Sequence, residues 1–533
     1  MSCPLLRRLA EPWPPGFGEP AATIRGPTPG DEVRHTPVVD RSWTPTTTRP
    51  ATVGSSSRLG LVVALAGLAA LGISLWRESA TPLGDPDLWW HVLLGRRLAE
   101  SWSFAGPEPL TGSAAGYVYN QWLPELLYAA ADRIAGLAGV VWVVHVTRVA
   151  WLVVLYAVCR CFAPPLLSTL VCAVSLLASG GSLSPRPQVV GLTLLAVTVW
   201  AWLRSADDGR ARWWLIPLTW VWAGSHGTWA VGLAVGALAI VARYLDRHRD
   251  RSELARLILV LAGSAATTLI TPVGPQLLGV FTAVNAISPY INEWKPLSVT
   301  STQLGAVVGL FAVVVLAWLS RSPAGEGALA SGTGGGPAPS DVPWSDRLLA
   351  LAALAMALTA ARSAAIGGVL LAPVAARTLA AWFPSGPRSR LERPVVAAIA
   401  AVLLVVPLAW VSTTSVANPA LIPTRLSTQL RALPAGTVVF NADTLGGWLM
   451  WAHPSLRVVY DTRAEAYGAA YVDRYMNARA VRPGWEHTIG DSGAAVALLE
   501  TGSPLGSALM GQLGWTEVGV DAGYRLLRAP DRP

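Results

Sequence analysis

Long apolar runs recur along this chain, and their lengths approach what a helix needs to cross a lipid bilayer. A spanning helix takes about 20 mostly apolar residues. Eleven such runs alternate with short polar segments: 59–76, 138–161, 164–180, 188–203, 213–225, 227–244, 256–272, 302–320, 347–361, 363–382 and 395–412. The runs 213–225 and 347–361 are short and also fit half-helices or re-entrant segments. The pattern predicts an α-helical polytopic membrane protein with about eleven spans.

The composition agrees with this fold class. Of the 533 residues, 52% are hydrophobic and only 14% are charged, whereas soluble domains carry about a quarter charged residues. The net charge is +8. Its arginines cluster between apolar runs, where membrane topology accounts for them, so we expect membrane lipids and no nucleic acid as partners.

Positive charge also predicts the orientation. Segments 204–212 and 243–256, the Gly/Ser-rich linker 321–346 and segment 385–393 hold the heaviest arginine clusters between spans, so they are expected in the cytoplasm. The Pro- and Thr-rich residues 1–58 lack apolar periodicity, which predicts a disordered cytoplasmic tail. A chain with its N-terminus in the cytoplasm and its C-terminal region outside needs an odd number of spans across the plasma membrane, which agrees with the count of eleven.

The last 121 residues, 413–533, change pattern and predict an extracytoplasmic α/β domain after the transmembrane bundle 59–412. Strand-like segments alternate with helical ones, which favours a small, mainly parallel sheet. The expected strands are 436–441, 456–461 and 494–500, followed by a last pair within 515–528, and the expected helices include 468–480 and 503–513.

This topology brings unusual polar residues to the external face: Asp85, Asp87, His91, Gln121, Glu125, Arg186, His226, Asn292, Glu293 and Arg362. Polar groups that gather at one end of a bundle indicate a binding or catalytic site. The first external loop, 77–137, is too long for a plain connector. Its segments 87–102 and 119–136 are predicted as amphipathic helices at the membrane surface, with Trp89 and Trp90 at the headgroup level.

Two interpretations of the acidic pair are open at this level. Asp87 fits the cap of a helix that begins at Leu88, with Asp85 in the turn before it. Alternatively, the two carboxylates act chemically. His91, one turn from Asp87, then serves as an acid/base partner or metal ligand, or it is an interface residue.

The segment "DPDLWWHVLLGRRLAESWSFAGPEPLTG" resembles the first external loop of a family of bacterial multi-pass proteins. That family is similar in layout to the GT-C superfamily, which includes protein O-mannosyltransferases and oligosaccharyltransferases. The resemblance continues in "SPRPQVVGL", "GSHGTWAVGL", "ISPYINEWKP", "ARSAAIGG" and "VVYDTRAEAYG", and covers nearly everything from residue 59 onward. The chain departs from the superfamily in lacking a second acidic pair in a later loop, and "LWWH" only mimics the Trp-Trp-Asp signature of oligosaccharyltransferases.

The resemblance implies a transferase that acts on a polyprenyl-phosphate sugar. An acidic residue of the first external loop would be the general base or would help to hold a divalent metal such as Mg or Mn. Asp85 or Asp87 fills that place, and Asp87 is favoured because His91 lies one turn away. The acceptor would be an envelope glycan, lipid or protein.

This chemistry assigns roles to the other polar residues. A carboxylate deprotonates the acceptor hydroxyl, and cations stabilise the departing phosphate. Arg186 and Arg362 suit the second task because an arginine fork matches phosphate, although Arg362 also fits a headgroup anchor. His226 either orients a sugar hydroxyl or is an ordinary turn histidine. Glu293 and Lys295 belong to a candidate substrate-contact loop.

In the C-terminal domain, Asp461 and Arg463 follow a predicted strand, where open α/β sheets place ligands. They form either an acceptor-binding edge or a structural turn that pins the domain to the bundle. For the whole chain, the alternatives to a glycosyltransferase are a transporter or lipid-carrier flippase, and a catalytically silent scaffold. A transporter would be expected to show internal repeats and midplane charges, which the sequence does not.

Overall fold

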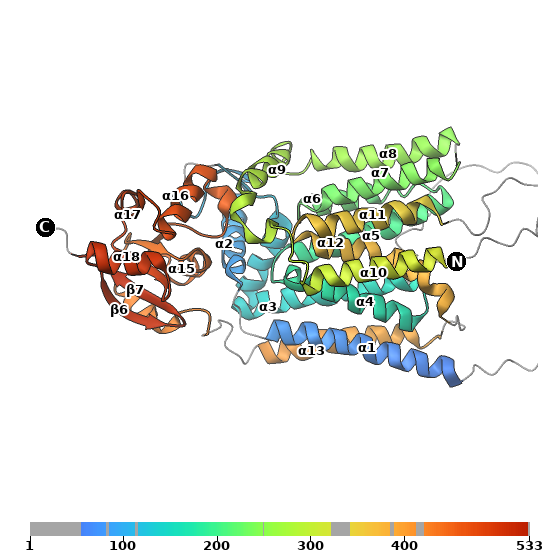
Figure 1. Cartoon of the computed structure of the whole chain (residues 1–533), viewed down its shortest axis with the longest axis horizontal. Helices are drawn as coiled ribbons and strands as arrows, with labels where there is room; N and C mark the ends of the chain where they lie inside the picture. The colour runs from blue at the N-terminus through green and yellow to red at the C-terminus, as the bar shows by residue number, and fades with distance from the viewer. Residues whose placement is uncertain are drawn as a thin grey trace, which may run out of the picture.

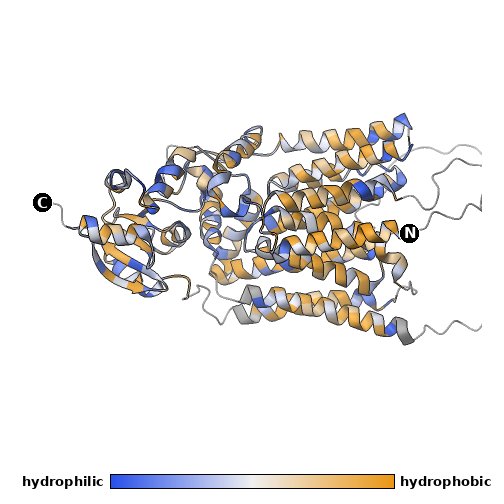
Figure 2. Cartoon of the chain, viewed as in Figure 1, coloured by the Kyte–Doolittle hydropathy of each residue, from blue (hydrophilic) through white to orange (hydrophobic). Residues whose placement is uncertain are grey.

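The computed structural model describes residues 55–80, 85–111, 116–248, 250–320, 342–383, 389–411 and 420–530. Residues 1–54 of the predicted tail and most of the linker 321–346 lie outside this part of the chain. Residues 55–58, which were expected to be disordered, form the first turn of a helix. Figure 1 shows a bundle of roughly parallel helices with a smaller domain at one end, and helices α2 and α9 lie between the two. Figure 2 shows that apolar residues dominate the bundle, whereas the C-terminal domain is more polar.

Every predicted apolar run coincides with a helix of the bundle. These helices are α1 (Ser55–Ala80), α3 (Trp122–Arg160), α4 (Pro165–Ser179), α5 (Gln188–Asp208), α6 (Leu215–Ala223), α7 (Trp229–Leu245), α8 (Arg251–Thr268), α10 (Thr302–Leu319), α11 (Trp344–Thr359), α12 (Ser363–Leu379) and α13 (Glu392–Val411). Six segments, in α1, α3, α4, α5, α10 and α12, are long and apolar enough to cross a membrane. The predicted polytopic helical fold is confirmed.

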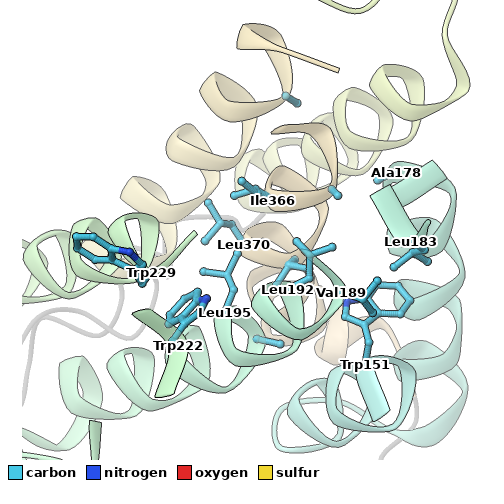
Figure 3. Packing of buried hydrophobic residues seen from close by; sticks show 14 of the residues in the cluster. Trp151, Ala178, Leu183, Val189, Leu192, Leu195, Trp222, Trp229, Ile366 and Leu370 are labelled. Carbon is cyan, nitrogen blue, oxygen red and sulfur yellow. The ribbon is translucent and has the colours of Figure 1, made fainter. Parts of the chain in front are cut away.

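Helix α12 forms the centre of the bundle. Its Ile366 and Leu370 lie close to Leu192 and Leu195 of α5 (Figure 3). Small residues allow α12 to approach α11 closely: a Cβ atom on Gly367 would lie 2.6 Å from the carbonyl oxygen of Ala353 in α11. Interfaces rich in small residues are typical of helices that associate in lipid.

The first loop folds differently from the prediction in two respects. It contains α2 (Pro86–Ser101), a hairpin of β1 (Ala105–Pro107) and β2 (Gly116–Val118), and the beginning of α3. Segments 119–136 and 138–161 form one helix with a kink at Gly136, where φ is +62°, a conformation that glycine adopts readily. Trp89 and Trp90 are not at a headgroup interface, because both are buried in the protein. Trp89 packs against Trp451 of the C-terminal domain, with ring centroids 5.1 Å apart.

The C-terminal domain contains a five-stranded sheet in the order β4-β3-β5-β7-β6. Its strands are β3 (Val438–Asn441), β4 (Arg457–Val458), β5 (Val496–Glu500), β6 (Thr516–Asp521) and β7 (Tyr524–Arg528). Its helices include α14 (Ser427–Arg431), α15 (Gly446–Ala452), α16 (Ala469–Arg479), α17 (Trp485–Ser492) and α18 (Pro504–Leu513).

This sheet is mixed, not mainly parallel as expected. Strands β4, β3 and β5 run parallel, whereas β7 is antiparallel to both β5 and β6. The reason lies in the turn between the last two strands. Ala522 and Gly523 both have positive φ, as in the tight turns that close antiparallel hairpins.

Three helices of the described residues were not expected from the sequence. Helices α14 and α17 belong to the C-terminal domain, and α9 (Gln276–Ile287) lies in the predicted loop 273–301. Helix α9 is followed by two short 3-10 turns, η3 (Ser288–Tyr290) and η4 (Asn292–Trp294). This segment places η4 at the end of the bundle that faces the C-terminal domain (Figure 1).

Candidate active site

Asp85 caps the N-terminus of α2. Its backbone is extended, and its Oδ1 accepts a hydrogen bond of 2.9 Å from the backbone N–H of Asp87. Pro86 occupies the first turn, where its missing N–H costs nothing. The helix therefore begins earlier than expected, and the capping interpretation of Asp87 is wrong. The Asp87 side chain is left to make other contacts.

Arg186 joins three acidic side chains from two separate parts of the chain. Its Nε lies 3.1 Å from Asp85 Oδ2, and its Nη1 lies 3.0 Å from Asp87 Oδ2 and 2.9 Å from Glu293 Oε1. Arg186 lies between η2 (Gly180–Leu183) and α5, and its side chain is only 15% exposed. The neighbouring carboxylates hold its pKa above the ordinary arginine value despite burial. This residue is the centre of the candidate site.

Glu293 also binds a second arginine. Arg362 Nη2 lies 3.0 Å from Glu293 Oε2, and the backbone N–H of Arg362 donates to the Glu293 carbonyl over 3.1 Å. These contacts fix η4 against the start of α12. Lys295 from the same segment is exposed, and its Nζ donates to Asn292 Oδ1 over 2.9 Å. Glu293 and Arg362 therefore join the cluster, whereas the Lys295 ammonium contacts Asn292 instead of its carboxylates.

A small cavity lies beside this cluster. Its volume is about 170 Å³, and its lining includes Ser184, Arg186, Gln188, Glu293 and Arg362. Hydroxyl, amide and guanidinium groups are the donors that oxyanions bind. The cavity therefore suits an anionic group that would contact both arginines.

Asp87 has the electrostatic properties of a general base. Burial raises its pKa from 3.8 to about 6; Arg186 opposes this effect, Asp85 adds to it, and the hydroxyl of Thr462 lowers the value. A base is most effective when its pKa lies near the working pH. Asp87 is therefore largely ionised at pH 7 and still basic enough to take a proton.

His91 lies one turn along α2 and contacts Glu125, a residue that was expected at the external face but was given no chemical role. Its Nδ1 lies 3.0 Å from Oε1 of Glu125, which is fully buried in the first turn of α3. Burial, with the nearby arginines, lowers the pKa of His91 well below 6.5, so the ring is neutral at pH 7. The signal for Glu125 was an acid in an otherwise apolar helix.

His226 contributes a second neutral ring. Its Nδ1 accepts the backbone N–H of Thr228 over 3.2 Å, in the turn between α6 and α7. Burial, followed by the charge of Arg362, lowers the pKa of His226 to about 3. This contact is that of a turn histidine, and the influence of Arg362 shows that the ring lies near the cluster.

The C-terminal domain reaches into the same site. The Thr462 hydroxyl donates to Asp87 Oδ1, and Trp90 Nε1 donates to the same hydroxyl over 2.9 Å. Neither Thr462 nor Trp90 was predicted as a site residue. Their contacts depend on the docking of α2 against the domain, which the sequence pattern does not show.

Asp461 and Arg463 flank Thr462 and are fully buried. Arg463 donates from Nε and Nη2 to Asp461 over 3.0 and 2.7 Å, and its Nη1 pairs with Glu108 of the first loop. Because neither side chain is accessible, this geometry is that of a structural turn which holds the domain on the first loop.

The donor set does not resemble a metal site. Arg186 already lies between Asp85 and Asp87, where a divalent ion would need to bind. No group of three or more His, Cys, Asp or Glu residues within the described ranges is arranged to hold a metal ion. We therefore derive no step through a metal.

Comparisons with known proteins add the fold class. Neither a protein-family model nor a curated protein sequence matches this chain. The structure is similar to the crystal structure of ArnT from Cupriavidus metallidurans in the apo state, with a TM-score of 0.50 and 15% identity over 88% of this chain and 98% of that chain. The fold is GT-C-like. The structure of the same ArnT bound to undecaprenyl phosphate gives a TM-score of 0.49 at 14% identity over the same shares.

This finding confirms the GT-C resemblance at the level of the fold. The GT-C-like architecture and the six apolar spanning segments make the chain an integral membrane protein. Within it, the cluster around Arg186 lies next to the C-terminal domain, because its Asp87 also accepts a hydrogen bond from Thr462.

Proposed function

We propose that this protein is a membrane glycosyltransferase, which moves a sugar from a polyprenyl-phosphate donor to an envelope acceptor at the outer face of the plasma membrane. The observation that carries the proposal is the position of Arg186. Its guanidinium contacts the candidate base Asp87 and also lines a cavity that Arg362 shares. The similarity to ArnT, which has been crystallised with undecaprenyl phosphate, supports a polyprenyl-phosphate donor.

The proposed reaction is a displacement at the anomeric carbon of the donor sugar. Asp87 takes the proton from an acceptor hydroxyl, whose oxygen forms the new glycosidic bond. The bond from the anomeric carbon to the phosphate oxygen breaks, and the polyprenyl phosphate leaves with the electron pair. Arg186 and Arg362 stabilise the negative charge that develops on the phosphate.

Glu293 has a defined place in this scheme. Its carboxylate binds both arginines, and its side chain is 43% exposed, much more than those of Asp85 and Asp87. A phosphate that enters the cavity would therefore replace Glu293 as the partner of the two guanidinium groups. Their positive charge would then be paired both with and without the phosphate.

The proposed orientation follows the distribution of arginine. The N-terminus and the arginine-rich loops would be cytoplasmic, and the site and residues 413–533 would be extracytoplasmic. A polyprenyl-phosphate sugar at the outer leaflet would then reach the cavity without leaving the membrane surface.

The test is sugar transfer by the purified full chain in lipid, with radiolabelled polyprenyl-phosphate sugars and an envelope extract as acceptor. Asp87→Asn should abolish transfer, because the amide cannot take the proton. The exposed Glu100→Gln variant in the same helix is the matched control and should keep wild-type activity. Equal transfer by Asp87→Asn and wild type would refute the carboxylate mechanism, and inhibition by a chelator would refute the metal-free mechanism.

A further inference from the structure

A second and larger cavity lies in the C-terminal domain. Its volume is about 410 Å³, within the range of about 300–1,000 Å³ that is typical of small-molecule sites. It lies at the edge strand β4 and is lined by residues of α16, α17 and the first loop. The lining residues that matter here are Thr111, Arg457, Tyr467, Tyr471, Arg474 and Asp491.

Tyrosine rings form one wall of this cavity. Tyr471 and Tyr475 are four residues apart and therefore lie on one side of α16, and Tyr467 lies just before the helix begins at Ala469. The Tyr467 and Tyr471 rings are stacked, with centroids 5.2 Å apart and an interplanar angle of 25°.

The tyrosine hydroxyls are already bound inside the domain. Tyr467 donates to Asp461 Oδ2 over 2.7 Å, and Tyr471 donates to the carbonyl of Val459 over 2.7 Å. These bonds hold the rings in place. Tyr467 and Tyr475 are buried, so the partly exposed Tyr471 is the ring that a ligand in the cavity would contact. A rigid aromatic surface with polar groups at its margin suits the C–H face of a sugar ring.

Charged side chains surround this aromatic wall. Arg457, Arg474 and Asp491 are exposed, and none of them forms an ion pair with another residue in the described part of the chain. The Arg474 guanidinium lies 6.0 Å from the centre of the Tyr471 ring. Arg479 in the same helix, by contrast, is paired with Asp443 and Glu500. Two unpaired arginines favour a ligand with a carboxylate or phosphate, since both match the arginine fork.

The cavity also adjoins the junction that supports the candidate base. Tyr467 contacts Asp461, and Thr111 donates its hydroxyl proton to Glu108 over 2.6 Å. Asp461 and Glu108 are the two ion-pair partners of Arg463, the neighbour of Thr462. A ligand in this cavity would therefore lie beside the ion pairs of Arg463, whose neighbour Thr462 contacts Asp87.

We propose that this cavity binds an acidic saccharide, a sugar unit that carries a carboxylate or a phosphate. Binding itself requires no transfer reaction. The additional statement that this saccharide belongs to the acceptor rests on the proposed function.

The test is calorimetric titration of the full chain in lipid nanodiscs, without donor. The ligands are cellobiouronic acid, maltose 1-phosphate, neutral cellobiose and adenosine monophosphate. At least one acidic disaccharide should bind at least about tenfold more tightly than cellobiose, because a charge-assisted hydrogen bond contributes about 1.5–3 kcal/mol. The carboxylate and phosphate arms identify which anion the arginines prefer.

Variants locate the binding site. Arg474→Gln should weaken binding of the acidic disaccharide about tenfold, whereas Arg528→Gln, an exposed arginine of β7 outside the cavity, should leave it unchanged. Thermal unfolding checks that both variants fold like the wild type. The proposal is overturned if neither acidic disaccharide binds, if cellobiose binds equally well, if only adenosine monophosphate binds, or if Arg474→Gln has no effect. None of these results depends on glycosyl transfer, so they are separable from failure of the proposed function.

Discussion

Replacing Arg186 by glutamine should raise the pKa of Asp87 from about 6 to about 8. The guanidinium lies 3.0 Å from Asp87 and lowers its pKa, against the effects of burial and of Asp85. Losing an opposite charge at this distance raises a carboxyl pKa by about 1–3 units. At pH 7 the ionised fraction of Asp87 would then fall from about 90% to about 10%.

Two assays follow this change. Infrared difference spectroscopy of the carboxyl C=O band, with Asp87→Asn subtracted, reports protonation without any substrate. The pH–rate profile of sugar transfer reports the same group as a base: because only the ionised form accepts a proton, activity rises with pH through the pKa. The wild-type midpoint should lie near pH 6 and the Arg186→Gln midpoint near pH 8.

Arg186→Lys is the control that separates charge from geometry. Lysine keeps the positive charge but not the planar fork, so the midpoint should stay near pH 6 while the transfer rate at its plateau falls. An infrared midpoint near pH 6 in Arg186→Gln would refute the electrostatic reasoning, since it would mean that Arg186 does not govern the protonation of Asp87.

Three further predictions concern the surroundings of the site. Thr462→Val should raise the midpoint of the Asp87 titration by about one pH unit, because it removes a hydrogen bond to the charged form; an unchanged infrared titration would contradict this contact. Arg463→Gln should lower the free energy of unfolding by about 3–5 kcal/mol, because two buried carboxylates lose their partner. Thermal unfolding in detergent measures this loss, and an unfolding midpoint equal to that of wild type would refute the role of the ion pairs. Gly95→Ala should lower the free energy of unfolding by about 1–3 kcal/mol, because its Cβ would overlap a backbone carbonyl of α3. In the control Gly309→Ala, the new Cβ meets nothing within 4 Å, so this variant should be neutral or stabilising. Equal unfolding midpoints of the two variants would show that α2 and α3 can separate at no cost.

The sequence predicted the helical bundle well because each span is a local property of the chain. Length and apolarity of a single run decide whether it can span a membrane, and no partner is needed to recognise it. The continuity of α3 across Gly136 and the helix α9 were missed, because glycine and proline are local signals of a break. Gly136 lies between two segments that were predicted as separate helices, and α9 lies in a segment with proline and glycine at its borders.

For the candidate site, the sequence identified polar residues but not their partners. The expected residues Asp85, Asp87, Arg186 and Glu293 do lie together. Thr462 was missed because nothing distinguishes a threonine in a turn after a strand from any other. Its contact with Asp87 spans 375 residues of sequence and arises only from the docking of two domains.

That long-range contact has a consequence for biogenesis. A nascent chain that has inserted its last bundle helix, α13, has all of its arginines and carboxylates around Arg186, but Asp87 still lacks the hydroxyl of Thr462, and Glu108 still lacks its arginine. The site is therefore completed only when the C-terminal domain has folded and docked on α2. Until the final quarter of the chain is made and docked, Asp87 lacks this hydrogen bond to its charged form, so its pKa would be higher and less of it would be ionised at pH 7.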